Sequence, residues 1–312
     1  MNSTRRPLKD ELRATASELG VPLDVIEKDY ALGHVLTSIY GDDELASCLV
    51  FKGGTALRKA YFSDYRFSVD LDFTGIGGPR GSDLEAAVAR IAAGAQQASL
   101  ERGSFRVASA RRNESEPHPG AQEAFQVRVQ YPWHSQPLCS IKLEMTTDES
   151  VLLPTICRNL LDSAEDRSDT MLVCYALEEI VAEKLRTPLQ AFRRAVEGKW
   201  VRNCARDYYD LWYLTSPDVA LDLETVGSIL REKCEARDVS FGHVGSFFPA
   251  TVVAEAERQW RSSLADLVRR LPTFEIVVAE LKPRIAAVLQ SIDGASGASY
   301  PQGGDSPGAE KA

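Results

Sequence analysis

The chain of 312 residues lacks several features that define large classes of proteins. No stretch approaches about 18 uninterrupted apolar residues, and the basic N-terminus precedes no apolar segment, so neither a membrane-spanning helix nor a secretory signal is expected. The six cysteines form no Cys-x-x-Cys pair, and the four histidines lie at no zinc-site spacing from them. These absences argue against a disulfide framework and indicate reduced thiols in a cytoplasmic protein that does not contact membranes.

The chain also lacks an excess of positive charge. It carries 36 Lys and Arg residues against 45 Asp and Glu residues, a formal net charge of −9. Such a balance excludes a protein that coats nucleic acid by bulk charge, but it is compatible with a local basic groove. The hydrophobic fraction of 44% and the charged fraction of 26% are those of an ordinary globular protein.

The hydrophobic pattern divides the chain into two halves and a tail. Within residues 1–165, helical periodicity covers 7–19, 23–40, 55–62 and 82–101, and strand patterns cover 48–51, 67–74, a pair that ends near 131, and 138–146. Helical periodicity then dominates residues 166–292, whereas Gly, Ser, Pro and Ala dominate residues 293–312. We predict an α+β protein with an N-terminal α/β domain, a helical domain that completes the active site, and a disordered tail.

Two aspartates lie on one face of a predicted strand. Residues 66–73 alternate strictly, so strand geometry places Ser68, Asp70 and Asp72 on the same face. Aspartate is disfavoured in strands, and two carboxylates side by side repel each other. A solvated edge strand would tolerate them. Alternatively, two convergent carboxylates on a rigid strand are suitable ligands for Mg²⁺ ions that coordinate the phosphates of a nucleotide.

Glycines and a further carboxylate accompany this strand. Gly53 and Gly54 follow an apolar run and open a predicted helix, which would let the backbone approach a phosphate closely. A sharp strand-to-helix turn needs glycine for steric reasons as well, so this signal is unspecific alone. Glu144 alternates with apolar neighbours and would supply a third carboxylate, as a base or a metal ligand, although an ordinary half-exposed strand shows the same pattern.

Charged side chains also fall on apolar helix faces in the second half. Lys184 follows Leu177 and Val181 at helical spacing, so its ammonium either reaches the edge of the helix or contacts a triphosphate. Asp207 should point inward, with Asp210 at the margin of the apolar stripe. Because a buried charge is costly unless paired, Asp207 belongs either to a functional site or to a structural ion pair.

A basic stripe covers residues 184–206. It contains seven Lys and Arg residues and the single acid Glu197, a local charge of +6, with Phe192 and Trp200 interleaved. Such a stripe suits the phosphate backbone of RNA better than a small sugar, and the aromatic rings would stack on bases. A solvated helix face is the alternative interpretation.

Taken together, these segments resemble the AbiEii/AbiGii toxin family of nucleotidyltransferases, which includes MenT-like toxins of type IV toxin–antitoxin (abortive infection) systems. The segments that carry the resemblance occur in the family's order: Val25-Ile26-Glu27-Lys28-Asp29-Tyr30, Phe51-Lys52-Gly53-Gly54-Thr55-Ala56-Leu57, Arg66-Phe67-Ser68-Val69-Asp70-Leu71-Asp72-Phe73, Glu183-Lys184-Leu185 and Arg206-Asp207-Tyr208-Tyr209-Asp210-Leu211. Each segment alone is unspecific, but their common order and spacing are characteristic.

The resemblance implies a DNA polymerase β-like nucleotidyltransferase core, a mixed sheet with flanking helices, plus a helical C-terminal domain. It implies catalytic roles for Asp70, Asp72, Lys184 and Asp207, with Asp70 and Asp72 binding Mg²⁺ (Mn²⁺ being an alternative). The expected substrate-binding residues are Lys52, Gly53, Gly54, Thr55, Arg66, Ser68, Glu144 and Asp210. Members of the family add nucleotides from NTP to RNA, notably to tRNA 3′ ends, and thereby block translation. A cognate antitoxin, typically a transcriptional regulator, counteracts them.

Three functions are therefore compared. The leading prediction is a Mg²⁺-dependent toxin that transfers NMP to RNA, with tRNA as the expected acceptor. The alternatives are a small-molecule nucleotidyltransferase of the antibiotic-modifying type and a catalytically idle binding protein of the same fold. Ser68 is also a hypothetical point of control, because a phosphate there would repel substrate. Full transferase activity in a Ser68→Glu variant would contradict that hypothesis.

Overall fold

A computed structural model describes residues 6–112, 121–161 and 169–296 of the chain. Its centre is a mixed sheet that, within the described residues, has seven strands in the order β3-β4-β5-β2-β1-β7-β6. The strands are β1 (Leu49–Lys52), β2 (Asp70–Gly75), β3 (Arg106–Arg112), β4 (Gln122–Gln130), β5 (Cys139–Thr146), β6 (Ile156–Asn159) and β7 (Met171–Cys174). β2 lies in the interior of the sheet, where it pairs parallel with β5 and antiparallel with β1.

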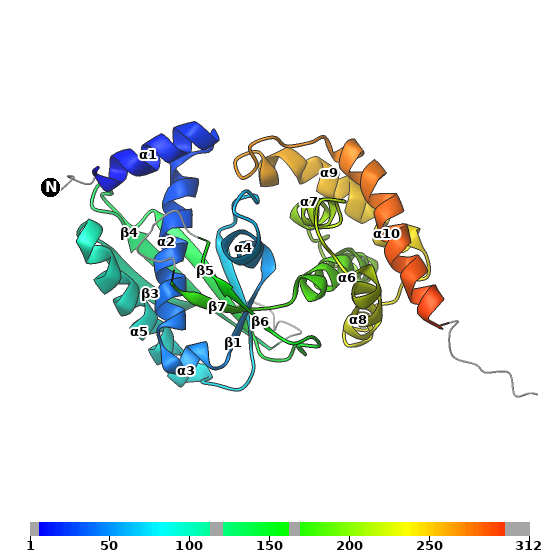
Figure 1. The fold of residues 1–312 in the computed structure, drawn as a ribbon, viewed down its shortest axis with the longest axis horizontal. Coiled ribbons are helices and arrows are strands. Elements are labelled where there is room, and N and C mark those ends of the chain that lie inside the picture. Colours follow the sequence, from blue (N-terminus) through cyan, green and yellow to red (C-terminus); the bar gives the residue numbers. More distant parts are fainter. Residues whose placement is uncertain (1–5, 113–120, 162–168, 297–312) are drawn as a thin grey trace, which may run out of the picture.

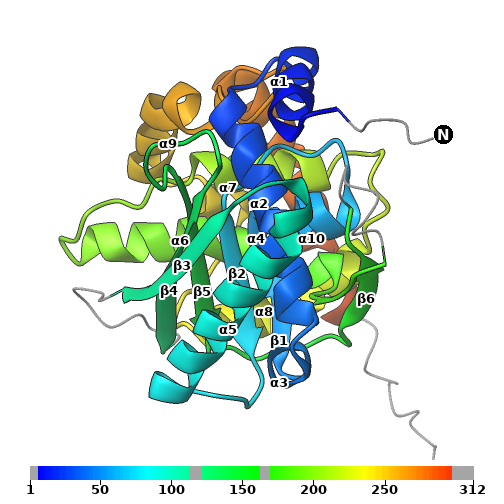
Figure 2. The ribbon, with the colours of Figure 1, turned by 90° about the vertical axis from the view of Figure 1, so that its left-hand side faces the viewer.

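Helices cover one face of this sheet. In Figures 1 and 2, α2 (Leu23–Tyr40) and α5 (Gly81–Ser99) cross that face, flanked by α1 (Leu8–Leu19) and the short α3 (Asp43–Ala46). The alternation of the strands explains this arrangement. Leu71 and Phe73 of β2 and the corresponding apolar residues of β5 are fully or almost fully buried, whereas Asp70, Asp72 and Glu144 project from the opposite face.

The C-terminal half consists of packed helices on the other side of the sheet (Figure 1). They are α6 (Leu177–Val196), α7 (Ala205–Leu214), α8 (Leu223–Glu235), α9 (Ala250–Leu264) and α10 (Phe274–Ser296). α6 contacts α7, α8 and α9, and α10 contacts α7 and α8. Over the described residues, no helix is both long enough and apolar enough to cross a bilayer. Helices α6 to α10 confirm the predicted helical C-terminal part.

Several boundaries differ from those read from the sequence. The predicted helix at 55–62 begins earlier, with α4 (Gly53–Ala56), and continues as one π-helical stretch, Leu57–Tyr61. The strand predicted at 67–74 begins only at Asp70. β6 and β7 were not predicted, because strands of four residues give almost no alternation to recognise.

The predicted domain boundaries stay predictions. β7 belongs to the sheet although it follows residue 165. α10 ends at Ser296, and the remainder of the predicted tail lies outside the described residues, as does the loop that follows β3.

Candidate active site

Strand register brings three carboxylates together. Asp72 is the direct neighbour of Glu144 across the parallel β2–β5 pair, and Asp70 is the neighbour of Lys142. Because β2 lies between two strands, the alternative of a solvated edge strand is wrong. The Thr55 hydroxyl donates a hydrogen bond to the backbone oxygen of Asp70, which fastens the start of α4 to the carboxylate strand.

The diglycine turn lies directly against these carboxylates. Gly53 has a φ of +77°, and a Cβ atom at this position would collide with the carboxylate of Asp72. A Cβ atom on Gly54 would lie 2.8 Å from Nη2 of Arg66 and 3.2 Å from the hydroxyl of Ser68. The glycines are therefore required by close approach to the strand that carries the carboxylates. Ser68 is 8% exposed, at the entrance to β2.

Arg66 and Asp210 form a buried, bidentate ion pair across the two halves of the chain. The guanidinium Nε and Nη2 donate to the two carboxylate oxygens at 2.5 and 2.7 Å, and the Tyr65 hydroxyl donates to the same carboxylate. Burial by itself would raise the pKa of Asp210, but Arg66 and Lys184 lower it to about 2. Asp210 was predicted at the margin of the apolar face of its helix, but it is completely buried.

Lys184 lies between two carboxylates of α7. Its Nζ is 3.0 Å from Oδ1 of Asp207 and 2.7 Å from Oδ2 of Asp210. These charges outweigh burial and raise the pKa of Lys184, so the ammonium is held in its charged form. The predicted inward orientation of Asp207 is confirmed, since this residue is 6% exposed. The interpretation of Lys184 as a lysine that extends to the solvent at the helix edge does not describe this geometry.

Two arginines connect this cluster to the carboxylates of β2. Nη2 of Arg202 is 3.8 Å from Oδ2 of Asp207, and Nη1 of Arg206 is 3.9 Å from Oδ2 of Asp70. Neither arginine belonged to the predicted site, although both lie in the basic stripe. Their position could have been inferred only by knowing that the start of α7 meets the start of β2.

One carboxylate of the site, Asp72, is not balanced by a cation among the described residues. Burial first, and then the charges of Glu144 and Asp70, raise the pKa of Asp72 to about 7. Burial also raises the pKa of Asp70, against the opposing effect of Arg206. Asp72 has no hydrogen bond or ion pair within the described residues, whereas Glu144 accepts from Gln122 and lies 2.5 Å from Lys142. Unbalanced negative charge at a strand is the environment that a divalent cation would relieve.

The oxygen ligands of Asp70 and Asp72 fit Mg²⁺ as a partial coordination shell. In the part of the chain that the structure describes, no three His, Cys, Asp or Glu side chains are grouped to enclose a metal ion. Mg²⁺ is commonly held by only one or two carboxylates, with substrate phosphates and water completing the octahedron. Asp70 and Asp72 supply such a partial set of hard oxygen ligands.

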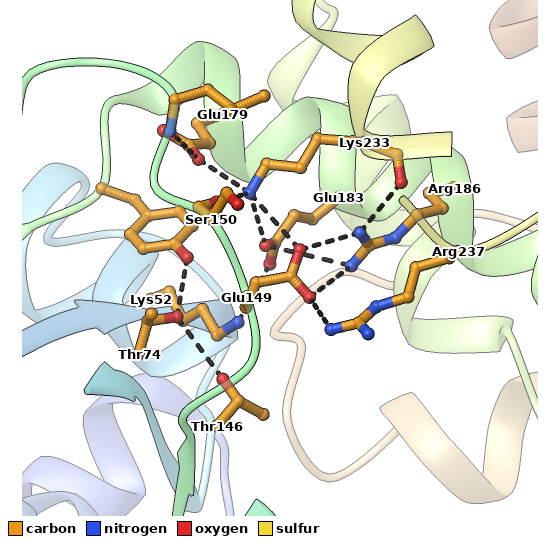
Figure 3. A network of polar contacts seen from close by, with 12 residues as sticks. Lys52, Thr74, Thr146, Glu149, Ser150, Glu179, Glu183, Arg186, Lys233 and Arg237 are labelled. Carbon is orange, nitrogen blue, oxygen red and sulfur yellow. Dashed lines mark hydrogen bonds and ion pairs between the residues drawn. The ribbon is translucent and has the colours of Figure 1, made fainter. Parts of the chain in front are cut away.

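Lys52 belongs to a second network of charges, shown in Figure 3. This lysine precedes the diglycine turn, and its Nζ lies 3.4 Å from Oε2 of Glu183 and over the ring of Tyr175. Glu183 also accepts from Lys233 at 3.2 Å. Lys52 therefore connects the glycine turn to helices α6 and α8, a role that its predicted place in substrate binding did not anticipate.

The carboxylates of this network are each held by cations or backbone amides, whereas the buried Nε of Arg186 has no hydrogen-bond partner in the described part of the chain. Lys233, which is 1% exposed, contacts Glu179 at 2.7 Å and donates to the backbone oxygen of Ser150 at 2.6 Å. Glu179 also accepts hydrogen bonds from the backbone amides of Leu152 and Leu153. Glu149 is held by Arg186 at 2.8 Å and Arg237 at 2.7 Å. These contacts clamp the segment after β5 onto the helical half.

The basic stripe is divided by the fold. Arg186 is buried and Lys184 is partly buried, and both form ion pairs, so they are not available on an open surface. Trp200 is 67% exposed and has Arg194 stacked over its ring, and Phe192 is 44% exposed. The stripe therefore consists of an internal part, in which Lys184 belongs to the site and Arg186 pairs with Glu149, and an exposed part near the end of α6.

The mixed sheet, the diglycine turn and the carboxylate strand define a nucleotidyltransferase. The family model described as the nucleotidyl transferase AbiEii toxin of type IV toxin–antitoxin systems matches residues 34–291, and the chain belongs to this family. No curated protein matches the sequence. Among solved structures, the chain is similar to MenT4, a nucleotidyltransferase toxin from Mycobacterium tuberculosis H37Rv, with a TM-score of 0.59 and 19% identity over 91% of this chain and 89% of that chain. At this identity the similarity concerns the fold.

Proposed function

We propose that this toxin transfers NMP from NTP to the 3′ end of RNA, with tRNA as the acceptor, in a reaction that depends on Mg²⁺ and stops translation. The observation that carries the proposal is the pair of carboxylates on β2, of which Asp72 lies directly against the diglycine turn without a partner among the described residues. Mn²⁺ is an alternative ion, and the cognate antitoxin is the expected regulatory partner. The exposed part of the basic stripe, with Trp200, supports a nucleic-acid acceptor over a small sugar.

Each group of the site has a proposed task. Asp70 and Asp72 would hold Mg²⁺, which supplies charge neutralisation at the phosphates. Gly53 and Gly54 place a backbone turn directly beside the carboxylates, where its amide groups would bind the triphosphate. Lys184 presents a permanently charged ammonium, which Asp207 and Asp210 hold in position. Arg66 positions Asp210, since it binds both of its oxygens.

The reaction itself is an in-line displacement. The acceptor hydroxyl oxygen forms a bond to the α-phosphorus, the bond from that phosphorus to the β-phosphate oxygen breaks, and pyrophosphate leaves with the electron pair. The hydroxyl proton needs an acceptor, for which we propose Glu144 beside Asp72. Positioning and charge neutralisation then supply most of the rate.

The test is incubation of the purified protein with total tRNA, each labelled NTP and Mg²⁺, beside an Asp70→Ala control. Label in RNA that disappears in the variant supports the proposal. Equal labelling by both proteins would contradict the assignment of the site. Label that appears only on small acceptors would favour an antibiotic-modifying enzyme, and binding of NTP without any transfer would favour an idle binding protein.

A further inference from the structure

The face of the sheet that carries the catalytic carboxylates continues across β5 and β4 to β3. Strand register places on this face, next to Asp70 and Asp72, the residues Ser140, Lys142 and Glu144 of β5, then Gln126, Arg128 and Gln130 of β4, and finally Arg106, Ala108, Ala110 and Arg112 of β3. We call this surface of β3, β4 and β5 the arginine face, after Arg106, Arg112 and Arg128.

The three arginines of this face are exposed, and none has a hydrogen bond or ion pair within the described residues. Arg111, on the opposite face of β3, differs, because it pairs with Glu85 and Glu123. Over these three described strands, the only acid on the arginine face is Glu144, at its catalytic end. The face is therefore a polar surface with unneutralised positive charge.

This surface is open and faces the helical half. α2 and α5 cover the other side of the sheet, and the views in Figures 1 and 2 agree that α6 and α7 lie toward the arginine face. Arg202 and Arg206 lie on this side of the sheet, at 3.8 Å from Asp207 and 3.9 Å from Asp70. The surface thus leads to the catalytic carboxylates.

The width of the arginine face and the side chains on it favour an extended anion over a folded protein as its ligand. Three strand spacings separate β2 from β3, a width of about 15 Å. The strand residues between the arginines are partly exposed glutamines and a serine and exposed alanines, without the aromatic and large aliphatic residues that form the centre of protein interfaces. Separated arginines on a polar surface suit a row of phosphates, because guanidinium groups bind phosphate oxygens.

We propose that the arginine face binds the phosphate backbone of the RNA acceptor and leads its 3′ end to Asp70 and Asp72. The inference rests on the proposed function and adds a second binding surface to it, on the sheet, separate from the basic stripe at the end of α6. Arg106, Arg112 and Arg128 contact phosphates and play no part in binding NTP.

The test compares two triple variants that change the net charge equally. The first is Arg106→Ala/Arg112→Ala/Arg128→Ala. The matched control is Arg13→Ala/Arg231→Ala/Arg261→Ala, which removes three exposed arginines from α1, α8 and α9. Binding of fluorescent tRNA is measured without NTP as a function of salt, and KM for RNA, KM for NTP and kcat are measured in the transfer assay.

Each lost phosphate contact removes about 0.7 from the slope of log K against log salt, which is about fivefold in affinity at 0.1 M salt. We expect the arginine-face variant to bind RNA about 100-fold more weakly with a slope reduced by about 2, while KM for NTP and kcat at saturating RNA are unchanged. The control variant should bind RNA as the wild type does, and the thermal transitions of all three proteins should coincide.

The outcomes separate the two proposals. A wild type that binds tRNA, with an arginine-face variant of equal affinity and slope, would overturn this inference and leave the proposed function intact. Equal weakening in both triple variants would also overturn it, because the effect would then reflect net charge alone. A variant that keeps its affinity for tRNA but loses the antitoxin would assign the face to an acidic protein instead. A wild type that labels no RNA contradicts the proposed function itself.

Discussion

Two clusters of carboxylates lie on either side of Lys52, and their electrostatic environments are opposite. The site carboxylates, Asp70, Asp72 and Glu144, project from the sheet and include Asp72, which has no partner among the described residues. The clamp carboxylates, Glu149, Glu179 and Glu183, are each held by lysine or arginine side chains (Figure 3). Both clusters consist of carboxylates, but every clamp carboxylate is held by a cation, whereas Asp72 is not.

The pKa values show this contrast. Burial raises the pKa of Glu149, yet Arg186 and Arg237 outweigh burial and hold that pKa well below its usual range. Burial and two neighbouring carboxylates raise the pKa of Asp72 to about 7. A folded protein keeps uncompensated charge where function requires it, since such charge costs stability. We infer that the clamp stabilises the fold and that the site binds a divalent cation together with its substrate.

Neutralising the site carboxylates should have the largest effect. In an Asp70→Asn/Asp72→Asn variant, transfer to RNA should fall by at least about 10³-fold, because the ligands of the divalent cation are lost. Thermal stability without Mg²⁺ should be equal to or higher than that of the wild type, because repulsion between neighbouring carboxylates is removed. Labelled-NTP transfer and thermal unfolding measure the two effects. A large loss of stability in this variant would show that the site carboxylates are as structural as the clamp.

Breaking the clamp should have the opposite signature. Lys233→Met removes the cation that Glu179 and Glu183 share, which leaves buried carboxylates uncompensated, so unfolding should become easier by about 3–5 kcal/mol. Urea unfolding measures the loss. The control is Arg90→Met, which removes surface ion pairs to Asp42 and Glu44 and should have little effect. A Lys233→Met protein with wild-type stability would refute the structural role of the clamp.

The comparison also shows how far the sequence can be interpreted. The helix predicted at 23–40 is α2, and the carboxylates of β2 were found because alternation within a strand is a local pattern. The Arg66–Asp210 pair joins residues 144 positions apart, and Lys233 meets Glu183 from another helix, so no local spacing signals either contact. The unpaired arginines on β3 and β4 were also invisible, since partner strands define which arginines are neutralised.

Occupation of the site should relieve its imbalance. With Mg²⁺ and a non-hydrolysable NTP at about 100 times the dissociation constant, binding should stabilise the protein by about 2.7 kcal/mol. Removal of the metal with EDTA should reverse the gain, which thermal unfolding detects. The Asp70→Asn/Asp72→Asn variant should show no metal-dependent shift. An equal shift in that variant would mean that the metal binds elsewhere, and the contrast between the two clusters would lose its functional meaning.

The smallest expected effect concerns Asp210, which resembles the clamp carboxylates although it borders the site. Its folded-state pKa of about 2 lies below the ordinary value of 3.8, so its ionisation stabilises the fold above about pH 4, and this contribution is lost as pH falls through about 2. The shift corresponds to about 2 kcal/mol. In urea unfolding, the stability difference between wild type and Asp210→Asn should be largest above pH 4 and shrink toward pH 2. A stability difference that does not change with pH would mean that Asp210 stabilises the fold through packing or hydrogen bonds alone. The ion pair that positions Lys184 would then be the one with Asp207.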